Sequence, residues 1–435
     1  MKCTSKIAAF IAIFFILNLL LCGFMPPDNG SSVDMWRRYH QKESVDIAVI
    51  GSSLASCALH EEDLAAATGK TVSLMATNAQ SWDMSQIALE TLLQEHTPER
   101  VILVMDPSNM TCDPYPKAQK AFLYAELQTA EPKDIPAEFL HYVTSSGNFT
   151  GADSLNAFFP WQSGSWPDNW LEKISRKASN VGELFSSRLK HQQDDGTESI
   201  IDFNTVGNQN TWNWVGHIFK QSDIDELTAM LQLCQQKGVS LLLITAPRTT
   251  LDVISYQTYF DDYAYFKQLC AQYGASYYDF NLAKPVLFES VEPDYFADYI
   301  HMSRAGGRAF SQSMAKFLEM LDAGQEVDSL FKTPDEYLAG VDYITNVYLT
   351  PEMHVDENKI LLFATSYQGP SVTPEYEFWA KSPRDTEYQK VLDYSDHTWI
   401  AYPLTERGTY QFRVNARAVG SDTDFDRYYE YSVDY

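Results

Sequence analysis

Short apolar runs alternate with amphipathic stretches over residues 45–105 of the chain. Val45 to Gly51 is a β-branched apolar run that ends in glycine, which is typical of a buried strand, and Leu54 to Ala67 then has helical spacing. The same reasoning predicts a strand at Thr71 to Met75, a helix at Met84 to Glu95 and a strand at Arg100 to Met105. Strands that alternate with helices predict a parallel sheet with helices on both faces.

The alternation returns after residue 220. It predicts helices at Ile224 to Gln236, Tyr263 to Tyr273 and Gly306 to Leu321, and strands at Val239 to Thr245 and Ser276 to Phe280. We therefore expect one three-layer α/β domain over residues 28–330. Residues 107–220 lack the pattern and are rich in proline and tryptophan, which predicts an insertion. Its tryptophans either stack on sugar rings or pack the insertion's own core.

The pattern of apolar and polar residues changes again near Thr333, where it predicts short strands separated by turns. They are expected at Asn358 to Ala364, Glu375 to Lys381, His397 to Ala401 and Thr409 to Ala416. In the last of these, Tyr410, Phe412 and Val414 share one face and polar residues the other, which is the period of two of a half-buried strand. The pattern predicts an antiparallel β-sandwich over residues 335–435.

The N-terminus carries a 19-residue apolar run, Ile7 to Met25, interrupted by Asn18. At about 1.5 Å per residue this run just spans a bilayer core, so residues 1–27 are interpreted as a signal anchor. Lys2 and Lys6 precede the run, which predicts a single-pass protein of the cell membrane with its N-terminus inside and the bulk of the chain outside. A cleaved signal peptide is the alternative; its small-residue cleavage site is not visible.

The formal charge of −26 would repel nucleic acid over most of the surface, so a nucleic-acid partner is not expected. No cysteine spacing is typical of a metal site, and neither a metal nor another cofactor is expected. Cys57, Cys234 and Cys270 are interpreted as buried thiols, although a disulfide between the last two stays open.

Two short segments have the residue types of nucleophilic catalysis. Ser52 and Ser53 stand at the turn from the first predicted strand into its helix, where backbone N–H groups could stabilise an oxyanion. Asp298 and His301 are three residues apart just before the last helix of the α/β domain, a spacing that lets a carboxylate orient an imidazole. Either segment alone is weak evidence, because serine caps many helices and D-x-x-H is frequent by chance.

Together these segments resemble the SGNH (GDSL-like) hydrolase superfamily over about residues 45–321. The resemblance implies a flavodoxin-like parallel sheet, with Ser53 as nucleophile, Asp298 and His301 as its catalytic pair, and Ser303 in the continuation of the histidine block. The family's two middle blocks, which help to form the oxyanion hole, are not cleanly present. Asn78 and Asn109 stand near their places, and with Ser53 they are the candidate oxyanion-hole residues.

The anchor and the Gly-Ser-Ser form of the first block look like the membrane-tethered branch of this superfamily, which includes the D-alanyl transfer protein of teichoic acid synthesis and alginate O-acetyltransferase-like proteins. That resemblance implies an acylated polysaccharide or teichoic-acid-like polymer as partner, often beside a multipass membrane acyltransferase. The C-terminal segment is similar to triple-tyrosine (Y_Y_Y) Ig-like sandwich modules, which implies a binding or spacer unit.

Two functions follow as hypotheses. The first is an extracytoplasmic serine esterase or O-acyltransferase that forms an acyl-enzyme at Ser53. The second is a catalytically inactive SGNH scaffold that acts as a cell-surface binding or assembly protein.

Overall fold

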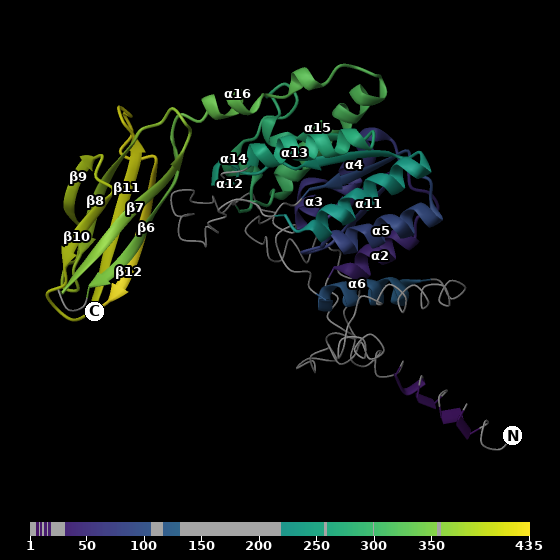
Figure 1. Cartoon of the computed structure of the whole chain (residues 1–435), viewed down its shortest axis with the longest axis horizontal. Coiled ribbons are helices and arrows are strands. Elements are labelled where there is room, and N and C mark those ends of the chain that lie inside the picture. Colours follow the sequence, from purple (N-terminus) through teal and green to yellow (C-terminus); the bar gives the residue numbers. More distant parts are fainter. Residues whose placement is uncertain are drawn as a thin grey trace. The chain divides into compact units, whose positions relative to one another are not determined.

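The computed structural model describes residues 31–105, 116–130, 219–255, 259–298, 300–354 and 358–435, with scattered residues between 6 and 18 (Figure 1). The chain divides into two compact units. Among the described residues, the first unit holds everything up to residue 130 together with 219–245 and 269–278. The second holds 246–268 and everything from 279 to the C-terminus.

A five-stranded parallel sheet forms the centre of the first unit. Its strands are β1 (Ile47–Gly51), β2 (Val72–Ala76), β3 (Arg100–Val104), β4 (Ser240–Thr245) and β5 (Ser276–Asp279), in the order β2-β1-β3-β4-β5. Both β1 and β2 are buried over their whole length, as expected of parallel strands covered on both faces. The predicted α/β class with a parallel sheet is therefore confirmed.

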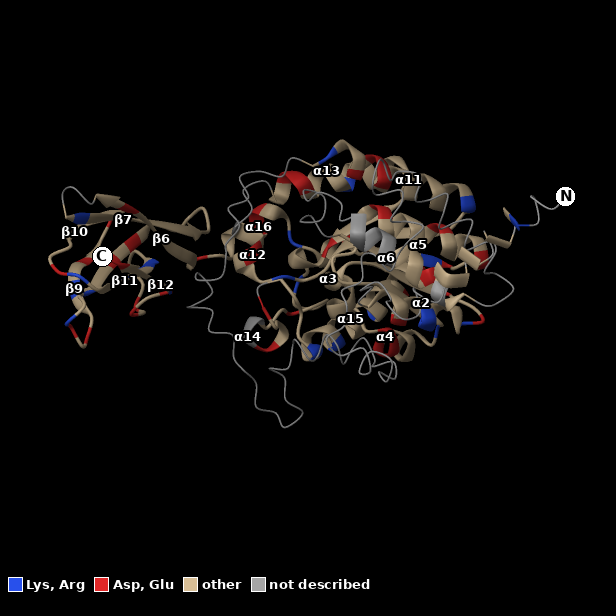
Figure 2. Ribbon diagram, turned by 90° about the horizontal axis from the view of Figure 1, so that it is seen from below, with Lys and Arg blue, Asp and Glu red and all other residues tan. Residues whose placement is uncertain are grey.

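Helices of the first unit lie on both faces of this sheet. They are α2 (Ser32–His40), α3 (Ser53–Ala58), α4 (Glu61–Thr68), α5 (Trp82–Glu95), α6 (Pro116–Thr129) and α11 (Gln221–Lys237). The chain steps from β1 out to β2 and then back past β1 to β3. Because such crossovers are right-handed, α4 and α5 must cover opposite faces. Figure 2 shows α5 and α11 together on one side and α4 on the other.

The helix predicted over residues 54–67 is instead two helices. Leu59 and His60 have extended backbones between α3 and α4, so the chain turns there. Two described helices of the first unit were not predicted: α2, and α6 within the expected insertion. They pack on each other, and the Trp36 Nε1–H donates to the Phe122 carbonyl at 3.1 Å. The tryptophans expected to shape that insertion lie outside the described residues.

The remaining helical segments come after β4. They are α12 (Thr250–Ser255), α13 (Tyr259–Gln272), η5 (Phe280–Leu282), α14 (Glu292–Tyr295), α15 (Arg304–Asp322), η6 (Asp328–Leu330) and α16 (Pro334–Ala339). In the second unit, α15 buries one apolar stripe: Phe310 and Phe317 place their ring centroids 4.9 and 5.3 Å from that of Phe280. This aromatic cluster fixes the helix that follows the predicted histidine block.

The C-terminal strands form two antiparallel sheets around one core, as the alternating pattern predicted. The strands are β6 (Ile344–His354), β7 (Lys359–Gln368), β8 (Pro374–Lys381), β9 (Gln389–Ser395), β10 (Trp399–Pro403), β11 (Thr409–Ala418) and β12 (Arg427–Asp434). Their orders are β10-β7-β6 and β12-β11-β8-β9. Buried side chains of both sheets, such as Leu362 and Phe412, belong to the same apolar cluster. The domain boundaries drawn from the sequence stay predictions.

Tyr410, at the start of β11, ties this core to the preceding turn. Its ring is fully buried, while its hydroxyl accepts the backbone N–H groups of Thr405 and Glu406 at 2.9 and 3.0 Å and donates to the Glu406 carbonyl. A tyrosine that bonds back to the backbone a few residues upstream fixes the entry of the strand into the sheet.

Most of the predicted anchor, residues 7–25, lies outside the described residues. In the part of the chain that the structure describes, no helix combines the length and the apolar composition that crossing a membrane requires. The three described cysteines are buried as expected, and Cys234 and Cys270 are free thiols rather than a disulfide. Burial raises the pKa of each of these two thiols to about 12.

Candidate active site

Ser53 stands directly beyond β1, as the first residue of α3. Its neighbour Ser52 is buried and caps the helix, because its Oγ accepts the Leu54 N–H at 3.3 Å. Ser53 is only half-buried. The two adjacent serines therefore have different positions, and Ser53 is the more exposed of the two.

Gly51 lets this turn pack against the next strand. A Cβ atom at residue 51 would lie 2.8 Å from the Ala55 Cβ and 3.1 Å from the Val104 carbonyl oxygen. The turn is thus held between its own helix and the end of β3. The ends of β1 and β3 flank the point where the strand order reverses, which is where open parallel sheets bind ligands.

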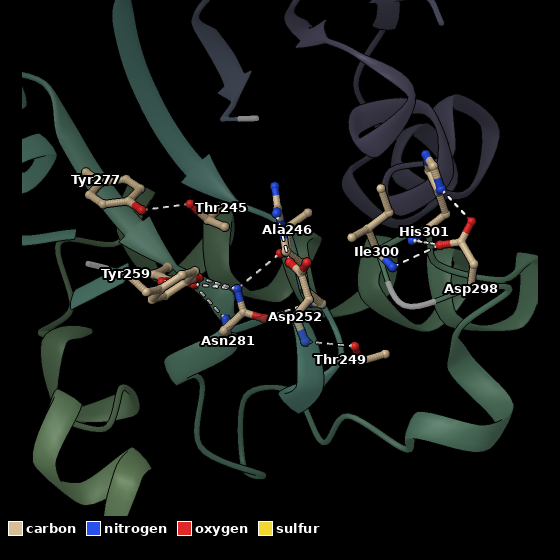
Figure 3. Close-up of polar contacts among 12 residues, drawn as sticks. Thr245, Ala246, Thr249, Asp252, Tyr259, Tyr277, Asn281, Asp298, Ile300 and His301 are labelled. Carbon is tan, nitrogen blue, oxygen red and sulfur yellow. Dashed lines mark hydrogen bonds and ion pairs between the residues drawn. The ribbon is translucent and has the colours of Figure 1, made fainter. Parts of the chain in front are cut away.

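The Asp298 carboxylate organises a tight loop around His301 in the second unit (Figure 3). Its Oδ2 lies 2.8 Å from His301 Nδ1, while its Oδ1 accepts the backbone N–H groups of Ile300 and His301 at 2.9 and 2.7 Å. A bridge between Phe296 and Met302 closes the loop. Both the ring and the backbone of His301 are therefore oriented by one carboxylate.

This geometry favours the ionised form of Asp298. Burial alone would raise the pKa of Asp298, but hydrogen bonding to the His301 ring, its charge and the two backbone N–H groups together lower it. An ionised Asp298 favours a proton on His301 Nδ1, which leaves Nε2 as the basic nitrogen.

The loop is anchored to the first turn of α15. Ser303 caps this helix by accepting the Gly306 N–H at 3.1 Å, and its own hydroxyl donates to the Asp294 carbonyl. Gly306 has no room for a side chain, because a Cβ there would lie 2.2 Å from the Tyr295 carbonyl oxygen. Capping thus explains Ser303, and packing explains Gly306.

The two halves of the predicted triad belong to different compact units, Ser53 to the first and Asp298 with His301 to the second. Asn78, one candidate for the oxyanion hole, is exposed, and its backbone N–H donates to Ser31 Oγ at 3.3 Å. Asn109, the other candidate, lies outside the described residues. The roles of all five residues stay predictions.

A buried polar network in the second unit was not predicted. Asp279 accepts from the Tyr259 hydroxyl at 2.7 Å and from the backbone and side-chain nitrogens of Asn281 at 2.9 and 2.8 Å. Asn281 Oδ1 in turn accepts the backbone N–H of Arg248, and the Arg248 side chain pairs with Asp252 at 2.9 Å. Burial raises the pKa of Asp279 despite these donors. The network ties the loops after β4 and β5 together, and its sequence signal is a set of polar residues directly after two buried strands.

Four carboxyl groups gather in the first unit, one in the first turn of α5 and three in the first two turns of α11. Burial, together with the charges of Asp83, Asp223 and Asp225, raises the pKa of Glu226 to about 8. Burial also raises the pKa of Asp223. Glu226 is the opposite case to Asp298: burial and neighbouring carboxylates raise its pKa, whereas hydrogen bonds to the His301 ring and to backbone N–H groups help to lower that of Asp298.

Neither a family model nor a curated protein matches the chain. Among solved structures, a protein provisionally described as a platelet activating factor from Streptococcus pneumonia is similar at 12% identity and a TM-score of 0.31, over 71% of this chain and 98% of that one. A modular endo-beta-1,4-mannanase from Cellulomonas fimi is similar at 12% identity and a TM-score of 0.15, over 94% and 97% of the two chains. Likenesses this weak say nothing about activity.

Proposed function

We propose that the protein is a serine esterase or O-acyltransferase of the SGNH type, in which Ser53 is the nucleophile and His301 its base. The observation that carries this proposal is the Asp298–His301 loop, whose carboxylate holds the imidazole through Nδ1 and through the backbone. The half-buried Ser53 at the switch point of a 2-1-3-4-5 sheet, the flavodoxin-like order, supports it.

The reaction requires Ser53 Oγ to come within hydrogen-bond distance of His301 Nε2. Nε2 then takes the hydroxyl proton as Oγ attacks the ester carbonyl, and the protonated ring returns this proton to the departing alcohol. The acyl-enzyme passes its acyl group to water in an esterase or to a glycan hydroxyl in a transferase. Ser53 N–H, Asn78 and Asn109 are the proposed oxyanion donors.

The proposed setting is the outer face of a cell membrane. Several side chains of the described N-terminal residues, among them Ile7, Phe10 and Ile13, are apolar and more than half exposed, which favours a lipid environment. The proposed partners are an acylated polysaccharide or teichoic-acid-like polymer and a multipass membrane acyltransferase. The seven C-terminal strands have the sheet orders of an Ig-like sandwich, and the Tyr410 hydrogen bonds support that assignment.

Covalent labelling tests the nucleophile. A fluorophosphonate should label the full-length protein, and the label should be absent from Ser53→Ala. Ser52→Ala is the matched control: it removes the adjacent hydroxyl and a helix cap, at about 1 kcal/mol of stability, yet should still be labelled.

The alternative function is an inactive SGNH scaffold that binds or assembles at the cell surface. The imperfect middle blocks around Asn78 and Asn109 favour it. Folded wild-type protein that takes up no label would support this alternative and contradict the enzyme.

A further inference from the structure

The central strand of the three-stranded sheet, β7, is apolar on both faces over its first half, Ile360 to Ala364. Ile360, Leu362 and Ala364 point into the sandwich core, whereas Leu361 and Phe363 alternate with them and so point outward. An antiparallel strand with one solvated face usually alternates apolar and polar residues. The run from Ile360 to Ala364 therefore indicates that a ligand or a partner covers the outer face of this sheet when the protein functions.

Aromatic residues of the neighbouring strands extend this outer face. Trp399 of β10 pairs with Phe363, their ring centroids lie 6.3 Å apart, and Trp399 remains 49% exposed. Further along the same face, the rings of Tyr348 and Tyr367 lie 6.0 Å apart. We define the aromatic face by six residues: Tyr348, Leu361, Phe363, Tyr367, Trp399 and Ala401.

The outer face of the other sheet is different, since its aromatic rings are covered by cations of the same face. Lys390 lies over Trp379 and pairs with Glu377 at 2.7 Å. Arg417 lies 3.9 Å from the Tyr394 ring centroid and pairs with Glu375. On that face, Lys390 and Arg417 therefore each have both a carboxylate and an aromatic ring as partners. On the aromatic face, the cross-strand row of Phe363 adds Thr350, and the row of Leu361 adds Ala401 and, at the edge, Glu352. Among the described residues of this face, charges gather only at its end, where Glu352 pairs with His354 at 3.0 Å beside Lys359.

We propose that the aromatic face binds a neutral polysaccharide. The C–H groups of a pyranose ring carry partial positive charge and pack on the negative faces of Trp, Phe and Tyr rings, while the hydroxyl of Thr350 can bond to sugar hydroxyls. The net charge of −26 opposes both a polyanion and a second copy of this chain at the same surface. This inference is independent of the acyl-transfer chemistry, because it concerns binding alone.

Affinity electrophoresis of the full-length protein tests it. Native gels would contain mixed-linkage β-glucan, glucomannan, arabinoxylan or dextran, with carboxymethyl cellulose as the polyanionic control. At least one neutral polymer should retard the wild type, and Trp399→Ala should weaken that binding roughly tenfold, the scale of a lost aromatic contact. Ala401→Arg, which adds a charge and removes no ring, should weaken it as well.

Matched variants separate this binding from other causes. Tyr428→Ala, on the opposite sheet, and Trp399→Tyr, which keeps an aromatic ring, should bind like the wild type, as should Ser53→Ala. Binding that survives both Trp399→Ala and Ala401→Arg would overturn the proposal. So would the absence of retardation by all four neutral polymers, or equal retardation by carboxymethyl cellulose. A dimer in analytical ultracentrifugation that Trp399→Ala dissociates would instead assign the face to a second copy.

Discussion

Among the described residues, two His–Asp pairs have the same separation in sequence but different surroundings. His60 and Asp63 pair at 3.0 Å, Asp298 and His301 at 2.8 Å, and the two imidazoles are similarly exposed, at 23% and 20%. The difference lies in the carboxylates: Asp63 belongs to the first turn of α4, whereas Asp298 holds both the ring and the backbone of its partner. A three-residue spacing alone therefore does not fix the orientation of an imidazole. The closed loop around Asp298 fixes that of His301.

The largest effect on turnover should come from replacing each of the two histidines, one at a time, with alanine. His301→Ala should lower the turnover of a small aryl acetate by roughly 10³ to 10⁶, because the nucleophile loses its base, while His60→Ala should stay close to the wild type. Ser53→Ala/His301→Ala should be little worse than either single variant, since the residues act as a unit. If His60→Ala abolishes turnover and His301→Ala does not, His60 is the base and our choice of pair is wrong.

Replacement of the carboxylates should have a smaller effect in the same direction. Asp298→Asn should lower kcat/KM by up to about 10⁴, because the amide can present an N–H to Nδ1 and favour the wrong tautomer. Asp63→Asn is its matched control and should keep near-normal kcat/KM, measured by initial rates. Equal losses in the two variants would mean that the backbone hydrogen bonds of Asp298 do not distinguish the pairs.

The packing of the histidine loop on α15 can be tested through stability. Gly306→Ala forces a Cβ against the Tyr295 carbonyl and should lower the free energy of unfolding by about 1–3 kcal/mol. Gly340→Ala is the control, because its Cβ would meet its nearest atom at 3.3 Å. Urea denaturation measures both. A Gly306→Ala variant as stable as Gly340→Ala would show that the loop gives way at little cost.

The smallest expected effect is a pH dependence of stability. The pKa of Asp298 is lower in the folded protein than in the unfolded chain, so its contribution is fully present above the unfolded value of about 3.9 and is lost as pH falls through the folded value. The stability difference between wild type and Asp298→Asn should therefore shrink on acidification, in denaturant titrations from pH 6 to pH 3. His301→Ala, which removes the ring donor, should weaken this dependence. A difference that grows on acidification would contradict the lowered pKa.

Helices and strands whose apolar residues recur at one regular spacing could be predicted from the sequence. Elements whose form depends on contacts with residues far away in the sequence could not. β1 and β11 follow from their apolar patterns alone. The helix predicted over residues 54–67 breaks because Leu59 and His60 adopt extended backbones, although their neighbours keep helical spacing. β9 was missed because it is polar and mostly exposed. β12 was missed because its inward positions, which include Arg427 as well as Tyr429, Tyr431 and Val433, are only half-buried.

The candidate site divides in the same way. The contact between Asp298 and His301 is local, so their spacing indicated it before the structure did. Ser52 and Ser53 differ in burial and in helix capping, and the spacing of residues in the sequence does not show these differences. Asn78 could be placed near the expected oxyanion block, but its backbone bond to Ser31 joins residues 47 positions apart and leaves no local signal.

The carboxyl cluster at the starts of α5 and α11 makes folding a proton-consuming reaction. With a pKa of about 8, Glu226 is mostly protonated at neutral pH in the folded protein, whereas a glutamate in the unfolded chain ionises near pH 4.3. The chain therefore takes up a proton as it folds between these values, and its stability declines as pH rises through that window. The heat of refolding should accordingly depend on the ionisation enthalpy of the buffer, and this dependence should be weaker in Glu226→Gln.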